Sequence, residues 1–320
     1  MTRSNGKSIR RRFKQFFKSQ LHTVFAQGQR LGFDILPRHF YSEIPDLRIL
    51  RGADSWKKPY SLTGVPGASA ADQSAWLQAM VPPEVQSDLK QKDVHQLACR
   101  DNGEDGYGPV EADVLHCFVL KHRPRQIFQI GCGVSTAICL RAAAEAGYRP
   151  RIICVEPYPT DFLRRAAAQN DIELVMQKLQ DMDPQRVAEL ADGDLFFVDS
   201  SHTLGPAGEV TRIMLEFLPR LRIGVYAHFH DIYLPYDYPG DILDQALFFS
   251  HETALLLAFL TLNPHFQIMC SLGILHHQKQ QDLLKLFARY VPAQYQAGVK
   301  TGEGHFPSSI FIRRVAGQPV

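Results

Sequence analysis

The stretch QIFQIGCGVST, residues 126–136, decides the fold class of this chain. A short apolar run ends in GCG, and an alanine-rich segment with a helical pattern follows over residues 134–147. Strand, glycine turn and helix in this order are typical of the first unit of a parallel α/β sheet. Gly131 and Gly133 allow a tight turn and a close approach of the backbone to a ligand. Because the helix points its positive end at that turn, we expect an anionic group, phosphate or carboxylate, to bind there.

The same alternation of apolar runs and helical patterns continues on both sides of this stretch. The runs that predict strands are residues 126–130, 151–156, 172–176, 194–200, 223–230, 266–270 and 308–315. The patterns that predict helices in this region are residues 111–122, 134–147, 160–169, 184–191, 208–218, 252–262 and 280–290. Strands separated by helices form βαβ units with right-handed crossovers. The sequence therefore predicts an α/β fold with one mostly parallel, seven-stranded sheet and helices on both faces.

The first part of the chain has a different composition. Residues 1–33 hold eight Lys and Arg and no acidic residue, and their apolar side chains recur at helical spacing. We therefore expect a basic amphipathic helix over residues 8–25. The sequence leaves its contact open: a membrane surface, a partner, or its own domain. The chain then divides into a basic helix and irregular leader (1–60), a linker and helical cap (61–110) and the α/β domain (111–320).

Composition sets the broad class of the protein. Apolar residues make up 45% and charged residues 21% of the 320 residues, a normal globular balance, and the net charge is +2. The longest apolar run, residues 254–262, is far shorter than the about 20 residues that span a bilayer. The cysteines, which form no CxxC pair, are residues 99, 117, 132, 139, 154 and 270. We therefore expect a cytoplasmic protein with reduced thiols and no DNA partner.

A carboxylate follows the second predicted strand. Glu156 lies 25 residues after Gly131, and an acid at this strand end can accept both hydroxyls of a ribose. Together with the glycine turn it favours a nucleoside-bearing cofactor. A dinucleotide fingerprint would need a third glycine at position 136, where Thr136 stands. An NAD(P)-dependent oxidoreductase is therefore the less favoured alternative.

Several ordered blocks of the sequence resemble one family. Seven strands with a late-inserted last strand resemble the class I S-adenosylmethionine-dependent methyltransferases, whose fold is Rossmann-like. The blocks run from about residue 35 to 315 and resemble bacterial small-molecule methyltransferases of the Methyltransf_24 family. They are LPRHFYSEIPD (36–46), FQIGCGVST (128–136), ICVEPYP (153–159), LFFVDSSHT (195–203), FLPRLRIGVYAHFHDIYLPYDYP (217–239) and HETALLLAFLTLNPHFQIM (251–269). The resemblance implies S-adenosylmethionine as the cofactor.

The resemblance also implies roles at the cofactor site. It places the glycine turn and Ser135 at the methionine moiety, Glu156 at the ribose, and Asp181 at the amino group of the adenine. Gln129 stands where the family often has an acid, and a glutamine does not offset the positive charge of the cofactor. The residues expected at the cofactor are Gln129, Gly131, Cys132, Gly133, Ser135, Thr136, Glu156, Asp181 and Asp199.

Polar residues end the fourth and fifth predicted strands, in LFFVDSSHT and in HFHD, residues 228–231. Because the carboxyl ends of parallel strands lie side by side, we expect these side chains to converge. Methyl transfer from a sulfonium to a hydroxyl needs a base at the acceptor, and histidine is the natural base at neutral pH. The residues expected to carry this chemistry are His202, His228, His230 and Asp231.

The same strand ends offer a possible metal site. Asp199 and Asp231 are two carboxylates that can hold Mg²⁺, which would orient the acceptor and lower its pKa. Related metal-dependent O-methyltransferases follow the second acid with Asp or Asn, whereas Ile232 stands here. The site is thus one oxygen ligand short of that pattern, and the sequence leaves metal use open.

These features predict an S-adenosylmethionine-dependent enzyme that O-methylates a hydroxyl of a small molecule or sugar. A second alternative stands beside the oxidoreductase: an inactive methyltransferase-like scaffold that acts through its basic N-terminal helix. Gln129 is the residue that keeps this scaffold alternative open.

Overall fold

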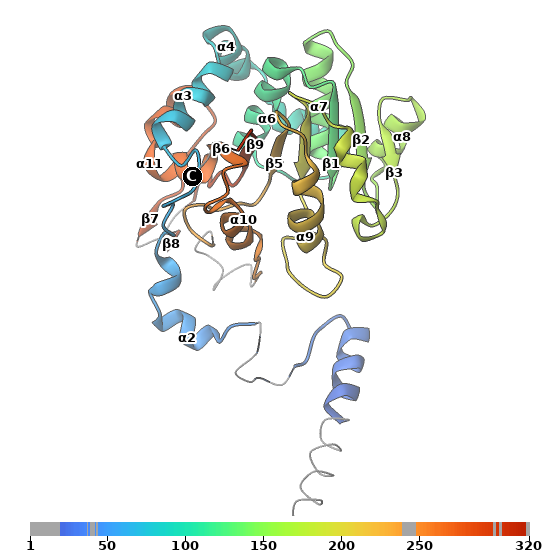
Figure 1. Ribbon diagram of the computed structural model, residues 1–320, viewed down its shortest axis with the longest axis vertical. Helices are drawn as coiled ribbons and strands as arrows, with labels where there is room; N and C mark the ends of the chain where they lie inside the picture. Colours follow the sequence, from blue (N-terminus) through green and yellow to red (C-terminus); the bar gives the residue numbers. More distant parts are fainter. Residues whose placement is uncertain are drawn as a thin grey trace, which may run out of the picture. The chain divides into compact units, whose positions relative to one another are not determined.

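A seven-stranded sheet forms the centre of the α/β region in this computed structural model (Figure 1). The structure describes residues 20–36, 38, 42, 44–238, 248–296, 299–300 and 303–317. The chain divides into two compact units, residues 1–50 and 51–320, and the sheet belongs to the second.

The strand order defines the topology of the sheet. Its strands are β1 (Gln126–Ile130), β2 (Arg151–Val155), β3 (Glu173–Val175), β4 (Leu195–Val198), β5 (Tyr226–Phe229), β6 (Phe266–Ser271) and β9 (Ile310–Arg314). They lie in the order β3-β2-β1-β4-β5-β9-β6. The pairs among β1 to β5 are parallel, and β9 lies antiparallel between β5 and β6. This arrangement confirms the predicted mostly parallel, seven-stranded α/β fold with a late-inserted last strand.

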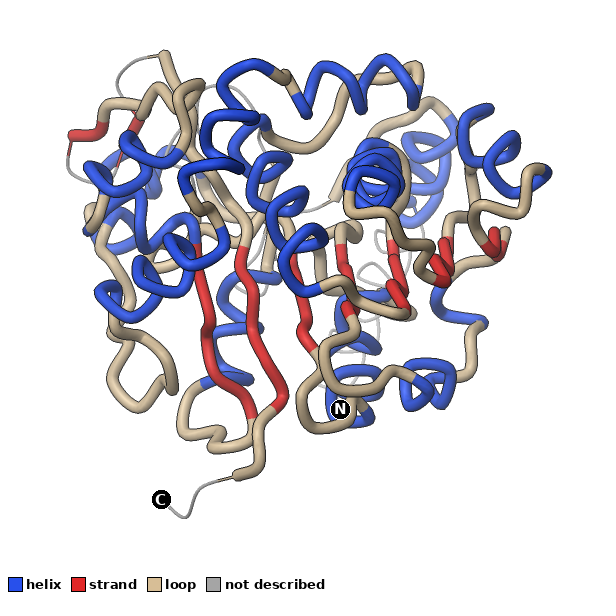
Figure 2. The backbone as a smooth tube through the Cα atoms, turned by 90° about the horizontal axis from the view of Figure 1, so that it is seen from above, coloured by secondary structure: helices blue, strands red, loops and turns tan. Residues whose placement is uncertain are grey.

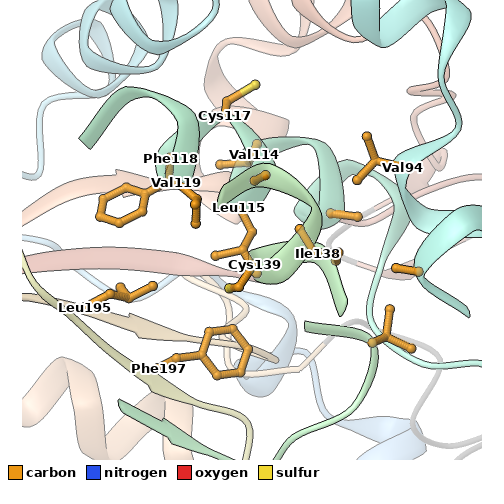
Figure 3. Close-up of a cluster of buried hydrophobic side chains, with 14 of the residues drawn as sticks. Val94, Val114, Leu115, Cys117, Phe118, Val119, Ile138, Cys139, Leu195 and Phe197 are labelled. Carbon is orange, nitrogen blue, oxygen red and sulfur yellow. The ribbon is translucent and has the colours of Figure 1, made fainter. Parts of the chain in front are cut away.

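Helices cover both faces of the sheet (Figure 2). One face packs against α5 (Val94–Asn102), α6 (Pro109–His122) and α7 (Val134–Glu145), and the other against η3 (Pro184–Glu189), η4 (Ile213–Phe217) and α10 (Glu252–Leu260). Successive strand residues point to opposite faces. Phe197 therefore belongs to the first core, where Figure 3 shows it below Leu115 and Ile138, whereas Phe196 belongs to the second.

Shorter elements complete the described chain. They are α2 (Leu47–Gly52), η1 (Ser55–Lys57), α3 (Ala70–Met80), α4 (Pro83–Gln91), α8 (Asp161–Ala168), η2 (Leu179–Asp181), α9 (Glu209–Arg212), η5 (Leu218–Arg220), α11 (Leu272–Gln278), α12 (Gln280–Leu286), β7 (Tyr295–Gln296) and β8 (Val299–Lys300). The Oγ1 of Thr160 accepts a hydrogen bond from the N–H of Leu163 at the start of α8. Such a cap satisfies one of the free N–H groups of the first turn.

Several predicted helices have different forms in the structure. The predicted helix 184–191 is only the 3₁₀ element η3 over Pro184–Glu189, although its Asp183 cap, which accepts from the N–H of Gln185, and Pro184 would equally fit the start of an α-helix. The predicted helix 208–218 is the short α9 followed by the π-helical turn η4. The sequence analysis missed α11, which follows β6 directly and is capped by Ser271. No loop signal separates these two elements.

Little of the predicted basic helix falls within the described residues. Residues 20–30 are helical, whereas residues 8–19 of the prediction lie outside the described part of the chain. The contact of this helix and the three-part domain division therefore stay predictions. Within the described residues, every helix is too short or too polar to cross a bilayer.

Candidate active site

Two adjoining cavities open at the carboxyl ends of β1, β2 and β4. The larger has a volume of about 600 Å³ and lies between the ends of β1 and β2, the turn at residues 178–180 and the segment 199–209. The smaller, of about 320 Å³, lies between the glycine turn and the loop at residues 102–107. The residues that line both cavities are Gly131, Glu156, Tyr158 and Asp199. The two cavities thus form one elongated site across the glycine turn.

The glycine turn leaves no room for a side chain at its first position. Gly131 has φ +74°, and a Cβ there would lie 1.9 Å from the backbone oxygen of Asp199. Gly133 has φ +153°, and a Cβ there would lie 3.2 Å from the side-chain amide of Asn102. The turn therefore brings the ends of β1 and β4 into contact, and glycine is required at Gly131.

Glu156 lies at the rim between the two cavities. Its Oε1 accepts a hydrogen bond from the N–H of Tyr158 at 2.9 Å, and its Oε2 accepts one from the N–H of Cys132 at 3.4 Å. These backbone donors hold the carboxylate beside the glycine turn. Gly131, Cys132, Gly133 and Ser135, all expected at the cofactor, line the cavities together with it.

Three residues expected at the cofactor do not line either cavity, namely Gln129, Thr136 and Asp181. Gln129 is fully buried; its amide N–H donates to Ser135 Oγ at 3.3 Å, and its Oε1 accepts from Thr136 Oγ1 at 2.8 Å. This glutamine network of Gln129, Ser135 and Thr136 packs inside the α7 side of the sheet, so Gln129 and Thr136 brace the turn from behind. Asp181 is exposed and outside the cavity lining, where Gln180 takes its place, because the η2 turn points Asp181 outward.

The loop before α6 was not expected at the site. Asn102 and residues 104–107 line the smaller cavity together with the glycine turn. Asn102 anchors this loop, because its Oδ1 accepts a hydrogen bond from Thr160 Oγ1 at 2.9 Å. The sequence signal was available in DNGEDGYGP, which combines glycines with acids, but its position over the cavity depends on the packing of α5.

An acid–histidine cluster lies at the ends of β4 and β5. His202 Nε2 is 3.4 Å from Asp199 Oδ1 and 3.5 Å from Asp231 Oδ2. His230 Nδ1 is 3.4 Å and 3.7 Å from the same two oxygens. Glu252, at the start of α10, is fully buried with its Oε2 2.7 Å from His202 Nδ1. The cluster therefore comprises Asp199, His202, His230, Asp231 and Glu252, and the sequence analysis missed only the last.

Strained backbone accompanies this cluster. His202, Asp231 and the neighbouring Tyr107 have φ of 59°, 55° and 59°, in the left-handed region that non-glycine residues rarely adopt. Each such residue costs of the order of 1–3 kcal/mol and persists only where the surroundings hold it. Strain of this kind is common at functional sites, and three of the seven non-glycine residues with positive φ in the described chain lie in or next to the cluster.

The charges of the cluster depend on one another. Burial disfavours the imidazolium of His202, but the hydrogen bonds that it donates to Asp199 and Glu252 outweigh burial and raise its pKa to about 10. Burial likewise opposes the charge of His230, yet Asp199 and Asp231 raise its pKa to about 9. The two imidazoles in turn outweigh burial and hold the pKa of Asp199 well below its usual range. Without a bound cation, protons on the histidines therefore balance the carboxylates.

His228 does not join the cluster. It is fully buried between Phe197 and Phe311, at ring-centroid distances of 4.9 Å and 4.3 Å, and its Nε2 shares a hydrogen bond with Tyr107 Oη at 2.9 Å. Burial lowers its pKa well below the usual value. His228 shares a face with His230, as alternation predicts, but it lies inside the sheet rather than at its edge. Because the His228 ring is fully buried, an acceptor in the cavities could not contact it.

The cluster has the composition of a divalent cation site. One ligand atom each of Asp199, His230 and Asp231 lies within 4.8 Å of the other two. Within the described chain, His230 Nδ1 is buried and makes no hydrogen bond. Two carboxylate oxygens and an imidazole nitrogen that faces them at ion-pair distance without a hydrogen bond fit a divalent ion. The expected pair Asp199 and Asp231 thus gains His230 as a third candidate ligand.

The fold and site together define a class. A sheet of this strand order, with a glycine turn after β1 and an acid after β2, has the Rossmann-like fold of class I S-adenosylmethionine-dependent methyltransferases. The family model Methyltransf_24, described as a methyltransferase domain, matches residues 128–232. This segment carries β1 to β5, the glycine turn and four residues of the acid–histidine cluster. The match confirms the resemblance expected from the sequence.

Individual relatives are distant. An uncharacterized protein of Archaeoglobus fulgidus is 27% identical over 156 residues, which cover 46% of this chain and 69% of that protein. The SAH-bound methyltransferase PaMTH1 of Podospora anserina is 15% identical, with a TM-score of 0.40 over 89% of this chain and 100% of that one. Cofactor-bound Rv0187 from MTB is also 15% identical, with a TM-score of 0.41 over 72% and 96%. Because both scores are low, the fold assignment rests on the strand order.

Proposed function

We propose that this protein uses S-adenosylmethionine to methylate a hydroxyl group of a small molecule, with a sugar among the candidates. One observation carries the proposal: Asp199 lines both cavities and belongs to the acid–histidine cluster. A cofactor bound along the cavities would therefore have its reactive end next to proton-accepting groups. Such proximity can replace a large part of the entropy cost of bringing two reactants together.

The chain offers a complete set of cofactor contacts. The larger cavity has room for the adenosine, with Glu156 at the ribose hydroxyls and Gln180 at the adenine. The smaller cavity would take the methionine moiety beside Gly133 and Ser135. Glu104 and Asp105 line this cavity too, and they provide the negative charge that Gln129 lacks.

The transfer is an in-line displacement. The acceptor oxygen forms a bond to the methyl carbon while the carbon–sulfur bond breaks. The electron pair of the broken bond stays on the sulfur, so the sulfonium becomes a thioether. The hydroxyl proton must leave the oxygen. In the metal-free protein the carboxylates keep a proton on the His202 imidazole. A cation held by Asp199, His230 and Asp231 would take over that charge balance, and His202 Nε2 would then receive the hydroxyl proton. Glu252 holds the other ring nitrogen of His202 at 2.7 Å. A base positioned in this way contributes typically about 10²- to 10⁴-fold.

The cation site would serve the same step. Asp199, His230 and Asp231 would hold the ion, whose charge offsets the two carboxylates and lowers the pKa of a hydroxyl bound to it. These three residues would then orient the acceptor towards the cofactor, while His202 remains free of the ligand set.

Calorimetry with S-adenosylmethionine and its demethylated product tests the cofactor. We expect both to bind the full chain, and the matched variant Gly131→Ala to abolish binding. Absence of binding to the intact protein would overturn the proposal and favour the inactive scaffold. Transfer of a labelled methyl group to a panel of hydroxyl, amine and thiol compounds then tests the acceptor class, and labelling of amines alone would contradict O-methylation.

A further inference from the structure

We infer that the cation site at the ends of β4 and β5 selects a divalent transition-metal ion, of the Co²⁺, Zn²⁺ or Fe²⁺ kind, over Mg²⁺. The inference rests on the cation site of the proposed function and goes further by naming the class of ion. It follows from the presence of imidazole nitrogen in a ligand set where an all-oxygen set would suit Mg²⁺. Mg²⁺ takes oxygen ligands and keeps several waters, whereas imidazole suits the later transition metals.

The position of His230 points to a ligand rather than a structural residue. Its Nδ1 faces Asp199 Oδ1 and Asp231 Oδ2 at 3.4 Å and 3.7 Å, and it is buried without a hydrogen bond among the described residues. The ring packs on Tyr107 with a centroid distance of 4.6 Å. Tyr107 is itself fixed, because its hydroxyl bonds to His228. The nitrogen is thus held towards the two carboxylates before any ion binds.

Asp231 is oriented by an equally specific set of contacts. Its Oδ1 accepts a hydrogen bond from Ser308 Oγ at 3.0 Å, which leaves Oδ2 to face the histidines. Ser308 is held in turn, because its N–H donates to Glu111 Oε1 at 2.7 Å. Hydrogen bonds to the second oxygen of a ligating carboxylate are a regular feature of metal sites, since they orient the ligand.

His202 adds a second imidazole beside the same two carboxylates. Its Nε2 lies within 3.5 Å of both Asp199 and Asp231, and its Nδ1 lies 2.7 Å from Glu252. A carboxylate on one ring nitrogen with the other nitrogen facing the site is the arrangement found around metal-bound histidines. His202 stays outside the ligand set, and its imidazole lies beside both ligating carboxylates.

Calorimetry with metal salts alone tests the inference on the full chain. EDTA-treated protein is titrated with CoCl₂ and MgCl₂ in the absence of S-adenosylmethionine. We expect Co²⁺ to bind more tightly than Mg²⁺, and His230→Asn, which exchanges the nitrogen ligand for an amide oxygen, to lower the Co²⁺ affinity about 10- to 100-fold while Mg²⁺ affinity is kept. The control Asp231→Asn should weaken both ions alike. An unchanged ratio in His230→Asn, or no binding of either ion, overturns the inference.

A measurement on the unmutated protein guards against a folding defect in the variant. Pulsed electron paramagnetic resonance of the Mn²⁺-loaded protein should detect a directly bound imidazole nitrogen, and an all-oxygen signal overturns the inference. Neither experiment involves the cofactor. Failure of S-adenosylmethionine to bind would therefore defeat the proposed function and leave the ion preference standing. Normal binding of S-adenosylmethionine without a preference for Co²⁺ would defeat the inference and leave the proposed function standing.

Discussion

Two polar groups, one buried and one partly exposed, lie at neighbouring strand ends and differ in how their hydrogen-bonding atoms are satisfied. In the glutamine network, Gln129 is matched on both sides of its amide by the hydroxyls of Ser135 and Thr136. In the acid–histidine cluster, His230 Nδ1 has no hydrogen bond among the described residues, and two members have left-handed backbone. We call the glutamine network closed, because both polar atoms of the Gln129 amide are hydrogen-bonded. We call the acid–histidine cluster open, because His230 Nδ1 makes no hydrogen bond within the described residues.

Hydrogen-bond satisfaction therefore distinguishes a polar group that supports the fold from one that is a candidate for function. A buried polar group that is fully hydrogen-bonded stabilises the fold at little cost, whereas a partly satisfied, strained group is costly and needs another reason to exist. Burial alone would not have separated them, because Gln129 and Glu252 are both fully buried. Four experiments test the comparison.

The largest effect is expected in the open cluster. Asp231→Asn keeps the shape of the side chain and its contact with Ser308 but removes a charge, so methyl transfer should fall about 10²- to 10⁴-fold. The free energy of unfolding should change by about 1 kcal/mol or less, since the amide oxygen still accepts the Ser308 hydrogen bond. Rates measured with an accepted hydroxyl compound, beside urea unfolding, check this. A variant that keeps full activity would place the chemistry elsewhere.

Of these two groups, only the open cluster should make stability depend on pH. The folded pKa values of His202 and His230, about 10 and 9, lie above the unfolded value of about 6.5. Their contribution is therefore complete below pH 6.5 and lost as pH rises through 9 and 10, by about 2–4 kcal/mol for the metal-free protein. Urea unfolding at pH 6.5 and 10.5 measures the loss. His202→Gln should show a smaller loss, and equal losses in both proteins would contradict the assigned charges.

The closed network should affect stability alone. Gln129→Leu leaves the Ser135 and Thr136 hydroxyls without their partner, and should cost about 1–3 kcal/mol of unfolding free energy. Cofactor affinity by calorimetry should stay within about threefold of the unmutated protein. Adding Thr136→Val should cost less than the sum of the single changes, because the two residues share one hydrogen bond. A large loss of affinity at normal stability would make Gln129 a cofactor residue after all.

The smallest effect concerns the support of the site. Thr160→Ala removes the cap of α8 and the donor to Asn102, and should cost about 1 kcal/mol. Thr160→Ser keeps the hydroxyl and should cost less than half as much. Thermal unfolding of the pair measures the difference, and equal midpoints would mean that the hydroxyl does not contribute.

The fold could be predicted because its signals are local. Apolar runs, glycine turns and helical spacing are readable within ten to fifteen residues, and parallel sheets bring their strand ends together by rule. For this reason Asp199, His202, His230 and Asp231 could be expected at one edge, although their roles stay predictions. Alternation alone could not separate His228 from His230, because it gives the face of a strand but not the depth.

The remaining site residues depend on tertiary packing. Glu252 reaches His202 only because α10 begins beside the end of β4, and the loop with Tyr107 covers the cavity only because α5 packs on α7. Helix propensity and spacing contain neither relation. Short elements also differ from the prediction: η3 stops after six residues despite its α-helical start signals, and α11 begins directly after β6 with no intervening loop.

Asp199 has a consequence for the order of events. It lines both cavities, and its carboxylate also faces the two histidines of the cluster. A sulfonium cofactor and a divalent ion would then share one negative charge, so occupancy of either position changes the affinity of the other by the same factor. Methyl transfer removes the sulfonium charge and would relieve that competition. Such heterotropic linkage would make the ion-loaded protein bind the demethylated product more tightly than S-adenosylmethionine. Release of that product would then limit the rate of turnover.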